Sequence, residues 1–234
     1  MKITLGTTYY NNPKLLQSFV DRNLPYVDEL IVVDDGSPKY PITDFLQPSN
    51  KIRLFRVTED YGFNSHGCRN LIMKQATNDW VVLIDIDRAF TEPEIAYNII
   101  KTTMLKETIL YRFTAFTNPS GIDAHQSVND FLIHKNHFFK AGGYDEELIG
   151  IRTGDRYFFE QLKHFGTEKI LYGINLKLLR RSSVRQKQLH KNNDWCSPND
   201  KPMRSSIMKI IKARIKTPEP NKQILTFNWE ELKK

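Results

Sequence analysis

The run Trp80-Val81-Val82-Leu83-Ile84-Asp85-Ile86-Asp87 constrains the fold more than any other part of the chain. A short, apolar, β-branched run without polar alternation is typical of a strand that is buried on both faces of a parallel sheet. Ligands collect outside the carboxyl ends of such strands, where this run carries two carboxylates. In an extended chain, residues i and i+2 point the same way, which predicts that Asp85 and Asp87 converge on one divalent cation, Mn²⁺ or Mg²⁺. The alternative is a merely polar strand end, and only the surrounding motifs separate the two readings.

Strands alternate with helices along the first 90 residues. Apolar runs at residues 3–7, 29–33 and 52–57 each end in a polar cluster, and helical spacing follows the first run and recurs at residues 65–76. This alternation predicts an α/β, Rossmann-like domain with a mostly parallel central sheet and helices on both faces. The pattern blurs at residues 107–130. Beyond it we expect a strand at 131–133, a short helix at 137–141 and an amphipathic helix at 155–165.

The charge of the chain is concentrated near its C-terminal end. The net charge is +7, but residues 177–216 alone carry 12 Lys and Arg against 2 Asp, which leaves the remainder of the chain at −3. A length of 234 residues suits one main domain, so we divide the chain into a core, 1–176, and a basic C-terminal extension, 177–234. A basic face implies an anionic partner, such as a nucleotide diphosphate, a nucleic acid, an acidic glycan or a membrane surface. The last 20 or so residues either form a mobile tail or dock through Phe227 and Trp229.

The cysteines and the apolar runs indicate a cellular compartment. Cys68 and Cys196 are far apart and have neither metal-type nor redox-type spacing, which favours a reducing environment. Residues 1–6 lack the apolar core of a signal peptide, and no apolar run is long enough to span a membrane. We therefore expect a cytoplasmic protein without a transmembrane segment. Its oligomeric state is left open.

Four segments, taken in order, resemble the motifs of a known family. The resemblance is to nucleotide-sugar glycosyltransferases of the A-type fold (GT-A), particularly the inverting family 2 and its galactosyltransferase-like relatives. The most specific match is the second segment, which corresponds to the family's I-I-V-V-D-D-G-S. The D-x-D of Asp85 and Asp87 follows the third segment at the family's interval. The segments are Thr7-Thr8-Tyr9-Tyr10-Asn11-Asn12-Pro13, Leu30-Ile31-Val32-Val33-Asp34-Asp35-Gly36-Ser37, Tyr61-Gly62-Phe63-Asn64-Ser65-His66-Gly67-Cys68-Arg69-Asn70, and Gly142-Gly143-Tyr144-Asp145-Glu146 with Gly150-Ile151-Arg152-Thr153-Gly154-Asp155.

The resemblance implies a metal-dependent transfer of a sugar from a nucleoside diphosphate donor, with UDP expected, to an acceptor hydroxyl with inversion. Residues 1–90 become the nucleotide-binding half and residues 91–176 the acceptor half. Carboxylates at a parallel strand end can accept hydrogen bonds from a base or a ribose, and a planar Arg near a helix start suits a pyrophosphate. The expected donor contacts are Thr7, Thr8, Tyr9, Asp34, Asp35, Gly62, Arg69 and Asp85, and the expected metal ligands are Asp87, Asp85 and His190.

Asp155 is the expected catalytic base, because inverting transfer needs a proton acceptor beside the acceptor hydroxyl. It also stands where a helix begins, so it can serve as a helix cap as well. One departure from the relatives is that Gly154 precedes Asp155, where they have Glu. A lone His66 is more often structural. By resemblance Tyr144 and Asp145 line the sugar or acceptor site, and we add Trp195 as an acceptor contact.

The acceptor has two readings. The first is a surface polysaccharide or a lipid-linked glycan. The second is a hydroxymethylated base in DNA, which is favoured by the basic segment and by Trp195 within it. A nucleotidyltransferase is a weaker alternative, because the first strand is not followed by a Gly-rich phosphate loop with a Lys. A non-catalytic basic binding module is favoured only by the missing Glu before Asp155. Fold resemblance alone does not decide among these functions.

Overall fold

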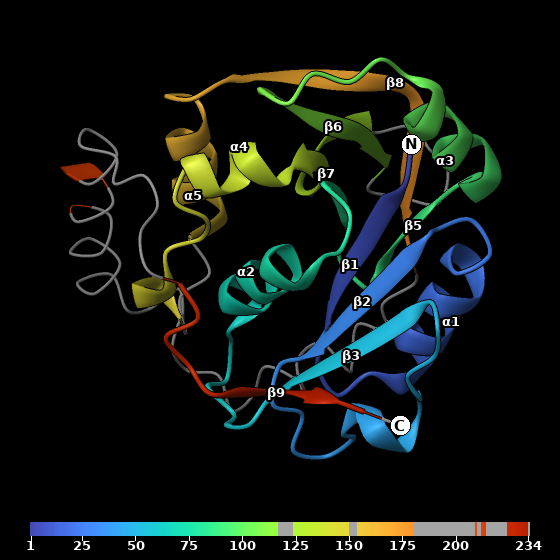
Figure 1. Cartoon of the computed structure of the whole chain (residues 1–234), viewed down its shortest axis with the longest axis vertical. Coiled ribbons are helices and arrows are strands. Elements are labelled where there is room, and N and C mark those ends of the chain that lie inside the picture. The colour runs from blue at the N-terminus through green and yellow to red at the C-terminus, as the bar shows by residue number, and fades with distance from the viewer. Residues whose placement is uncertain (117–123, 150–153, 180–208, 210–211, 214–223, 234) are drawn as a thin grey trace.

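A single mixed sheet organises the molecule (Figure 1). The computed structural model describes residues 1–116, 124–149, 154–179, 209, 212–213 and 224–233. Within these residues nine strands pair in the order β5-β8-β6-β7-β4-β1-β2-β3-β9. The strands are β1 (Ile3–Tyr9), β2 (Glu29–Asp34), β3 (Ile52–Val57), β4 (Trp80–Leu83), β5 (Arg88–Phe90), β6 (Ile109–Phe116), β7 (Ala124–His134), β8 (Thr167–Leu178) and β9 (Trp229–Leu232).

The strands β4, β1, β2 and β3 form the parallel part of the sheet. All six residues of β2 are buried, and β1 has one partly exposed residue, as expected for strands covered on both faces. These strands and the helices between them match the alternation predicted from the sequence, and the α/β class is confirmed.

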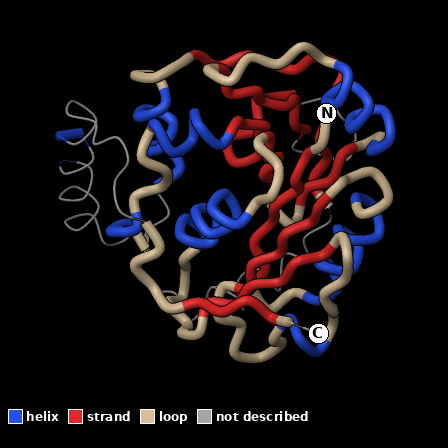
Figure 2. Tube along the Cα trace, in the orientation of Figure 1, coloured by secondary structure: helices blue, strands red, loops and turns tan. Residues whose placement is uncertain are grey.

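Five α-helices and two 3₁₀ turns accompany the strands in the described part of the chain (Figure 2). Asn12 and Asn64 cap α1 and α2, since their side chains accept hydrogen bonds from the backbone N–H groups of Leu15 and Gly67. The bounds are α1 (Pro13–Asn23), α2 (Ser65–Gln75), α3 (Pro93–Thr102), α4 (Lys135–Lys140) and α5 (Gly154–Leu162), with η1 (Ile42–Asp44) and η2 (Glu146–Leu148).

The helices cover both faces of the sheet, as the sequence predicted (Figure 1). Helices α1 and α3 pack on one face, where Phe19 and Ile100 belong to one apolar cluster. Helices α2, α4 and α5 pack on the other, where Ile72, Phe138 and Phe158 belong to a second cluster. The sheet is therefore the middle layer, and the loops at the carboxyl ends of its parallel strands remain open for a site.

The second half of the sheet differs from the sequence expectation. Strand β7 is antiparallel to both β4 and β6, and it is longer than the predicted strand at 131–133. Strand β8 was not predicted at all; it pairs in parallel with β6 and antiparallel with β5. Its burial does not alternate regularly, and Gly173 interrupts it at a φ of +83°, so the usual strand periodicity is lost.

The last described residues complete one edge of the sheet. Strand β9 pairs antiparallel with β3, and the Trp229 ring packs edge-on against Phe55 with centroids 5.9 Å apart. Phe227 is 7% exposed, so docking is the correct one of the two alternatives for this segment. The division of the chain at residue 176 stays a prediction, because residues 180–208 lie outside the described part.

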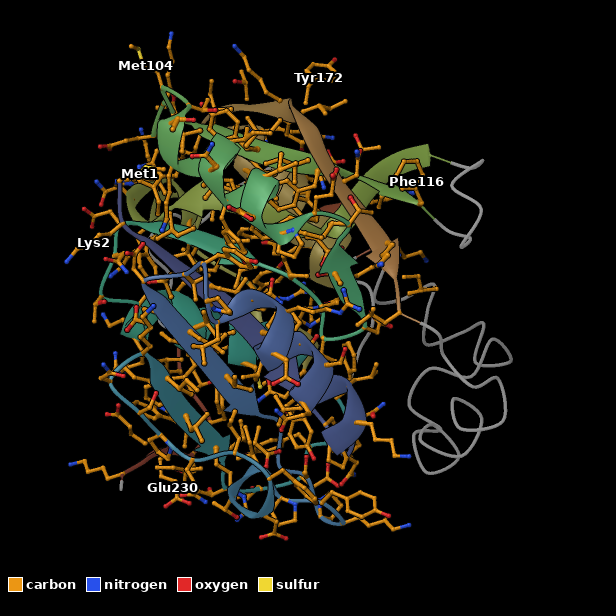
Figure 3. All side chains as sticks on the ribbon, turned by 90° about the vertical axis from the view of Figure 1, so that its right-hand side faces the viewer. Met1, Lys2, Met104, Phe116, Tyr172 and Glu230 are labelled. Carbon is orange, nitrogen blue, oxygen red and sulfur yellow. The ribbon has the colours of Figure 1, made fainter. Side chains whose placement is uncertain are left out.

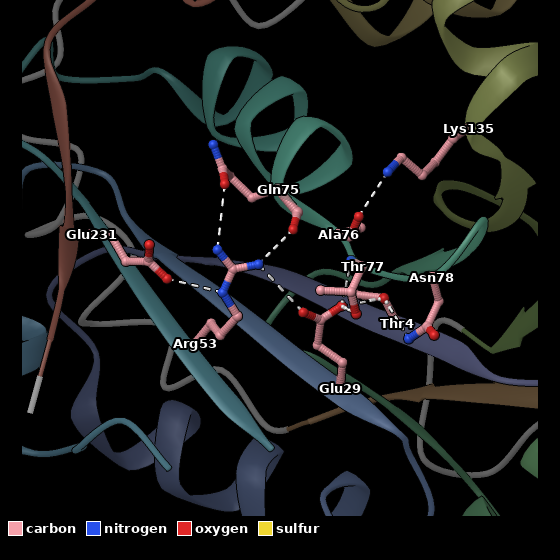
Figure 4. Close-up of polar contacts among 9 residues, drawn as sticks. All are labelled: Thr4, Glu29, Arg53, Gln75, Ala76, Thr77, Asn78, Lys135 and Glu231. Atoms are coloured by element: carbon pink, nitrogen blue, oxygen red, sulfur yellow. Dashed lines mark hydrogen bonds and ion pairs between the residues drawn. The ribbon is translucent and has the colours of Figure 1, made fainter. Parts of the chain in front are cut away.

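A polar cluster ties β9 to the start of the parallel strands (Figure 4). We call it the Arg53 cluster. The Arg53 guanidinium contacts Glu231 on β9 (Nε–Oε1, 2.9 Å) and Glu29 on β2 (Nη1–Oε1, 3.5 Å), and it donates to the Gln75 carbonyl at the end of α2 (2.6 Å). Glu29 in turn accepts bonds from Thr4 and Thr77. The cluster joins the four strands β1, β2, β3 and β9 and the end of α2 at the amino-terminal ends of the parallel strands.

Among the large apolar side chains of the described residues, Met104 and Tyr172 are the most exposed, with 91% and 78% of their surface accessible. Both lie at the end of the molecule opposite Glu230 (Figure 3). Of the helices in the described ranges, none combines the length and the apolar character that crossing a bilayer requires.

Candidate active site

The first polar loop at the carboxyl edge begins with Asp34, which is fully buried. Its Oδ1 accepts the Ser37 N–H (2.8 Å), and its Oδ2 accepts the Ile42 N–H (2.9 Å). Burial raises the pKa of Asp34, although these hydrogen bonds oppose the rise. Gly36, between Asp34 and Ser37, turns the chain at a φ of +69°, and a Cβ there would lie 2.5 Å from the Glu59 carbonyl oxygen. Asp34 therefore shapes the loop, with both carboxylate oxygens taken by backbone N–H groups.

Asp35 links the end of β2 to the start of α2. It is 6% exposed, and its Oδ2 accepts the backbone N–H of Asn64, the residue that caps α2. Burial raises the pKa of Asp35 to about 7, against the opposing effect of the Asn64 bond. This carboxyl group therefore changes its charge near neutral pH, next to the loop where a nucleotide is expected.

The other residues expected to contact the nucleotide-sugar donor differ in how accessible they are to a ligand. Tyr9 has its ring in the core, and its hydroxyl donates to the Tyr40 carbonyl (2.6 Å), so in this structure its side chain faces away from solvent. Thr7 is 2% exposed, whereas Thr8 is partly exposed. Gly62 has a φ of +74°, and its N–H donates to Asp60 (2.8 Å). Of the β1 residues, Thr8 is thus the one best placed for a ligand, and the donor contacts stay predictions.

Arg69 is the centre of the site. Its Nη1 contacts Asp155 Oδ1 (2.6 Å), and its Nη2 contacts Asp85 Oδ1 (2.6 Å). Nη1 also donates to the Tyr144 hydroxyl (3.0 Å), and the Arg69 side chain is 4% exposed. The rigid fork of a guanidinium suits two carboxylates at once. Four residues predicted from separate motifs are therefore brought together by one buried cation.

The same cation sets the protonation of Asp155. Burial alone would raise the pKa of Asp155, but the Arg69 charge, followed by His66, outweighs it and lowers the pKa to about 2. Asp155 is therefore a carboxylate at neutral pH. A carboxylate with so low a pKa is a weak proton acceptor for as long as Arg69 is bound to it.

Tyr144 is held by a frame that the sequence reasoning missed. Asn70 Oδ1 accepts the Tyr144 N–H (2.8 Å), and Asn70 Nδ2 donates to the Tyr144 carbonyl (2.9 Å) and to Glu146 (2.8 Å). The quoted motifs contain both Asn70 and Glu146, but no spacing rule reveals that two motifs 74 residues apart bond to each other. Asp145 is 3% exposed and accepts the Glu147 N–H (3.1 Å), which starts η2.

The D-x-D segment does not have the extended geometry that the sequence predicted. Strand β4 ends at Leu83, and the Arg88 N–H donates to the Asp85 carbonyl (2.9 Å), which closes a turn across the two acidic residues. The argument from alternating side-chain directions was therefore wrong. Asp85 Oδ2 accepts a bond from Asn129 (3.2 Å), and Asp87, which is 7% exposed, has its carbonyl bonded to the Leu179 N–H (2.8 Å).

The residues present fit a divalent ion that arrives with phosphate. No group of three or more His, Cys, Asp or Glu side chains suited to a metal occurs within the described ranges. Mg²⁺ at phosphate sites is commonly held by one or two carboxylates, the phosphates and water, so Asp85 and Asp87 suffice in chemistry and number. Arg69 competes for one oxygen of Asp85. His190 and Trp195 lie outside the described residues.

Comparison with known proteins agrees with the fold. Residues 4–101 match the family model Glycosyl transferase family 2. No curated protein sequence matches the chain. Similar solved structures include S. aureus TarS 1–349, with a TM-score of 0.62 and 16% identity over 94% of this chain and 66% of that one.

Two further structures contain nucleotides or nucleotide sugars. GalNAc-T7 with UDP, GalNAc and Mn²⁺ has a TM-score of 0.61 and 11% identity, over 95% of this chain and 55% of that one. The mannosyltransferase PcManGT from Pyrobaculum calidifontis, with GDP-Man and Mn²⁺, has a TM-score of 0.60 and 14% identity, over 92% and 70%. The chain thus spans only part of each neighbour, and at these identities the likeness establishes the fold.

Proposed function

We propose that this chain, which has the A-type glycosyltransferase fold and matches glycosyl transferase family 2 over residues 4–101, transfers a sugar from a nucleoside diphosphate to an acceptor hydroxyl. The observation that carries the proposal is the meeting of Asp85 and Asp155 on Arg69 at the carboxyl edge of the parallel strands. In this proposal Asp85 serves the metal and the diphosphate, and Asp155 serves as the base on the other side of the same cation.

Each residue has a distinct task in the proposed reaction. Asp85 and Asp87 hold Mn²⁺ or Mg²⁺, which when bound neutralises the negative charge that builds on the leaving diphosphate. Asp155 accepts the proton of the acceptor hydroxyl as that oxygen attacks the anomeric carbon, which gives inversion. Tyr144, which is buried, supports the site by accepting a hydrogen bond from Arg69.

Arg69 connects donor binding to the activation of the base. In the structure its guanidinium is shared between two carboxylates. A diphosphate is a stronger competitor for a guanidinium than either carboxylate, because it offers more charge and more acceptor oxygens. Once Arg69 turns toward the diphosphate, the pKa of Asp155 rises toward its ordinary value, and Asp155 becomes a better proton acceptor.

The donor is tested with a panel of UDP-sugars and GDP-mannose in the presence of Mn²⁺, with release of the nucleoside diphosphate as the readout. Asp87→Ala is expected to abolish Mn²⁺-dependent release. Asp155→Asn is expected to lose about 100-fold or more in turnover, while its affinity for UDP and Mn²⁺ in calorimetry is kept or raised, because Arg69 then has one carboxylate fewer to leave. The control is Asp21→Asn, an exposed carboxylate on α1 whose Oδ1 accepts a bond from Gln17. Nucleotide release at the wild-type rate by either site variant would remove that residue's role, and no release by the wild type from any donor would refute the proposal.

The acceptor proposal is a surface polysaccharide or a lipid-linked glycan, and the alternative is a hydroxymethylated base in DNA. Most of the basic segment that favours DNA lies outside the described residues, so the choice depends on experiment. The protein and the donor that it turns over are incubated with glycan acceptors and with hydroxymethylcytosine-containing DNA, and the products are analysed by mass spectrometry. A hexose or pentose mass on DNA would select the alternative, and sugar on glycans alone would select the first reading.

A further inference from the structure

His66 is a wholly buried imidazole beside the candidate base. Its ring stacks on Tyr144 with centroids 5.4 Å apart and meets Phe63 edge-on at 5.5 Å. Neither ring nitrogen makes a hydrogen bond to any residue that the structure describes, and Nε2 lies 3.8 Å from Asp155 Oδ2. Buried polar groups are nearly always hydrogen-bonded, so a buried imidazole in this condition calls for an explanation.

Gly154 provides the room for this ring. A Cβ at position 154 would lie 2.5 Å from His66 Cε1 and 2.7 Å from Nε2. Because His66 is packed between two aromatic rings, it cannot move aside to admit a side chain at residue 154. Any side chain at residue 154 would therefore separate the imidazole from Asp155. The contact between His66 and Asp155 therefore depends on a glycine at residue 154.

We propose that His66 acts through Asp155 as the final proton acceptor of the reaction, so that the base is the Asp155–His66 pair. This inference rests on the proposed function. The acceptor O–H bond breaks and its proton moves to Asp155, while the acceptor oxygen bonds to the anomeric carbon. The bond from that carbon to the diphosphate oxygen breaks, and its electron pair leaves with the diphosphate. The proton then passes from Asp155 Oδ2 to His66 Nε2.

The ordinary proton affinities of the two groups favour this order. An imidazole ordinarily binds a proton more tightly than an aspartate carboxylate does, so a proton that reaches Asp155 has a stronger acceptor beside it. The transfer needs the 3.8 Å separation to shorten to a hydrogen bond of about 3 Å. The groups that face His66 are Asp155 from α5, the Tyr144 hydroxyl and, through Asp155, Arg69 from its own helix.

The pairing itself is tested without turnover, by NMR of the imidazole ring signals near neutral pH. The His66 signal is assigned by its loss in His66→Phe, which keeps an aromatic ring in the stack. Asp155→Asn is expected to shift the ring signals of His66, because the imidazole loses its carboxylate neighbour. The exposed His164 serves as the internal control, and its signals should coincide in both proteins. Unchanged His66 signals in Asp155→Asn would overturn the inference, whether or not the protein transfers sugar.

The role in proton transfer is tested by the kinetics of nucleotide release, with the UDP-sugar that the wild type turns over fastest. His66→Phe should lose about tenfold in kcat and keep its donor KM, and the same replacement made in Asp155→Asn should cost little more. A wild-type kcat in His66→Phe, or an equal loss in both backgrounds, would overturn the inference. Absence of release by the wild type would instead refute the proposed function, and the NMR comparison would still report on the pair.

Discussion

Replacing Glu146 with Gln is expected to loosen the C-terminal segment of the chain. The Glu146 carboxylate accepts four hydrogen bonds of 2.8 Å: Oε1 takes Asn70 Nδ2 and the Leu225 N–H, and Oε2 takes the N–H and the hydroxyl of Thr226. A glutamine offers one accepting oxygen, and its NH₂ group must face two of these donors. With the oxygen toward Asn70 and Leu225, the Thr226 hydroxyl can rotate to accept, but the Thr226 N–H has no acceptor.

The magnitude follows from these four bonds. One stranded backbone N–H costs about 1–3 kcal/mol, and hydrogen bonds to a charged acceptor are worth up to about 1 kcal/mol more than neutral ones. With one bond lost and three weakened, and with Glu146 9% exposed, we take about 3 kcal/mol as the expected local loss. A factor of ten corresponds to about 1.4 kcal/mol, so local opening should become about 100-fold more frequent.

Hydrogen–deuterium exchange at residues 224–232 measures this opening directly. Exchange in Glu146→Gln should be about 100-fold faster there, while β1 and β2 keep their protection. Glu147→Gln is the matched control, since it changes the same chemical group on an exposed neighbour. Acceleration of less than threefold in Glu146→Gln, or equal acceleration in the control, would refute the reasoning that Glu146 fastens this segment.

Two further predictions concern stability. Because burial raises the pKa of Asp35 to about 7, the folded state binds this proton more tightly than the unfolded state, so Asp35 should make stability fall as pH rises from about 4 to 7. Asp35→Asn should flatten the urea midpoint over that window, and an unchanged slope would contradict the assignment. In the Arg53 cluster (Figure 4), Arg53→Met should lower the free energy of unfolding in urea by about 1–2 kcal/mol, because the Gln75 carbonyl and Glu231 lose their hydrogen-bond donor. A decrease below about 0.5 kcal/mol would show that the cluster does not stabilise the fold.

The first half of the fold was predictable because its strands are short, apolar and separated by helices. The run at 52–57 coincides with β3, and the helix expected at 65–76 differs from α2 by one residue. Such elements are specified by local periodicity, and their parallel order follows from the crossover helices.

The second half was not predictable from local pattern. Strand β8 forms because it pairs with β6 and β5. The exposed Tyr172 and the left-handed Gly173 interrupt the periodicity by which a strand is recognised in a sequence. Strand β9 has four residues, two of them glutamates, and is a strand only because the β3 edge receives it. Partner strands decide such segments, and a single sequence does not reveal the partner.

The candidate site shows the same limit. The motifs supplied Arg69, Asp85, Tyr144 and Asp155, which the structure brings together. The spacing of residues in the sequence did not predict the turn after β4 or the side chain that each carboxylate contacts. The structural use of Asp34 and the packing of His66 against Gly154 likewise depend on contacts between distant segments.

The pairing of β9 with β3 also determines when the β3 edge of a newly synthesised chain can be covered. Thr58 and Asn228, which meet where these two strands join, are 170 residues apart. At a synthesis rate of about 5–20 residues per second, the β3 edge stands open for about 10–30 s before its partner leaves the ribosome. An unpaired strand edge is a template for other chains. Slow translation, or a chain cut short before residue 229, should therefore favour aggregates over monomers, even though every residue of the candidate site is already in place.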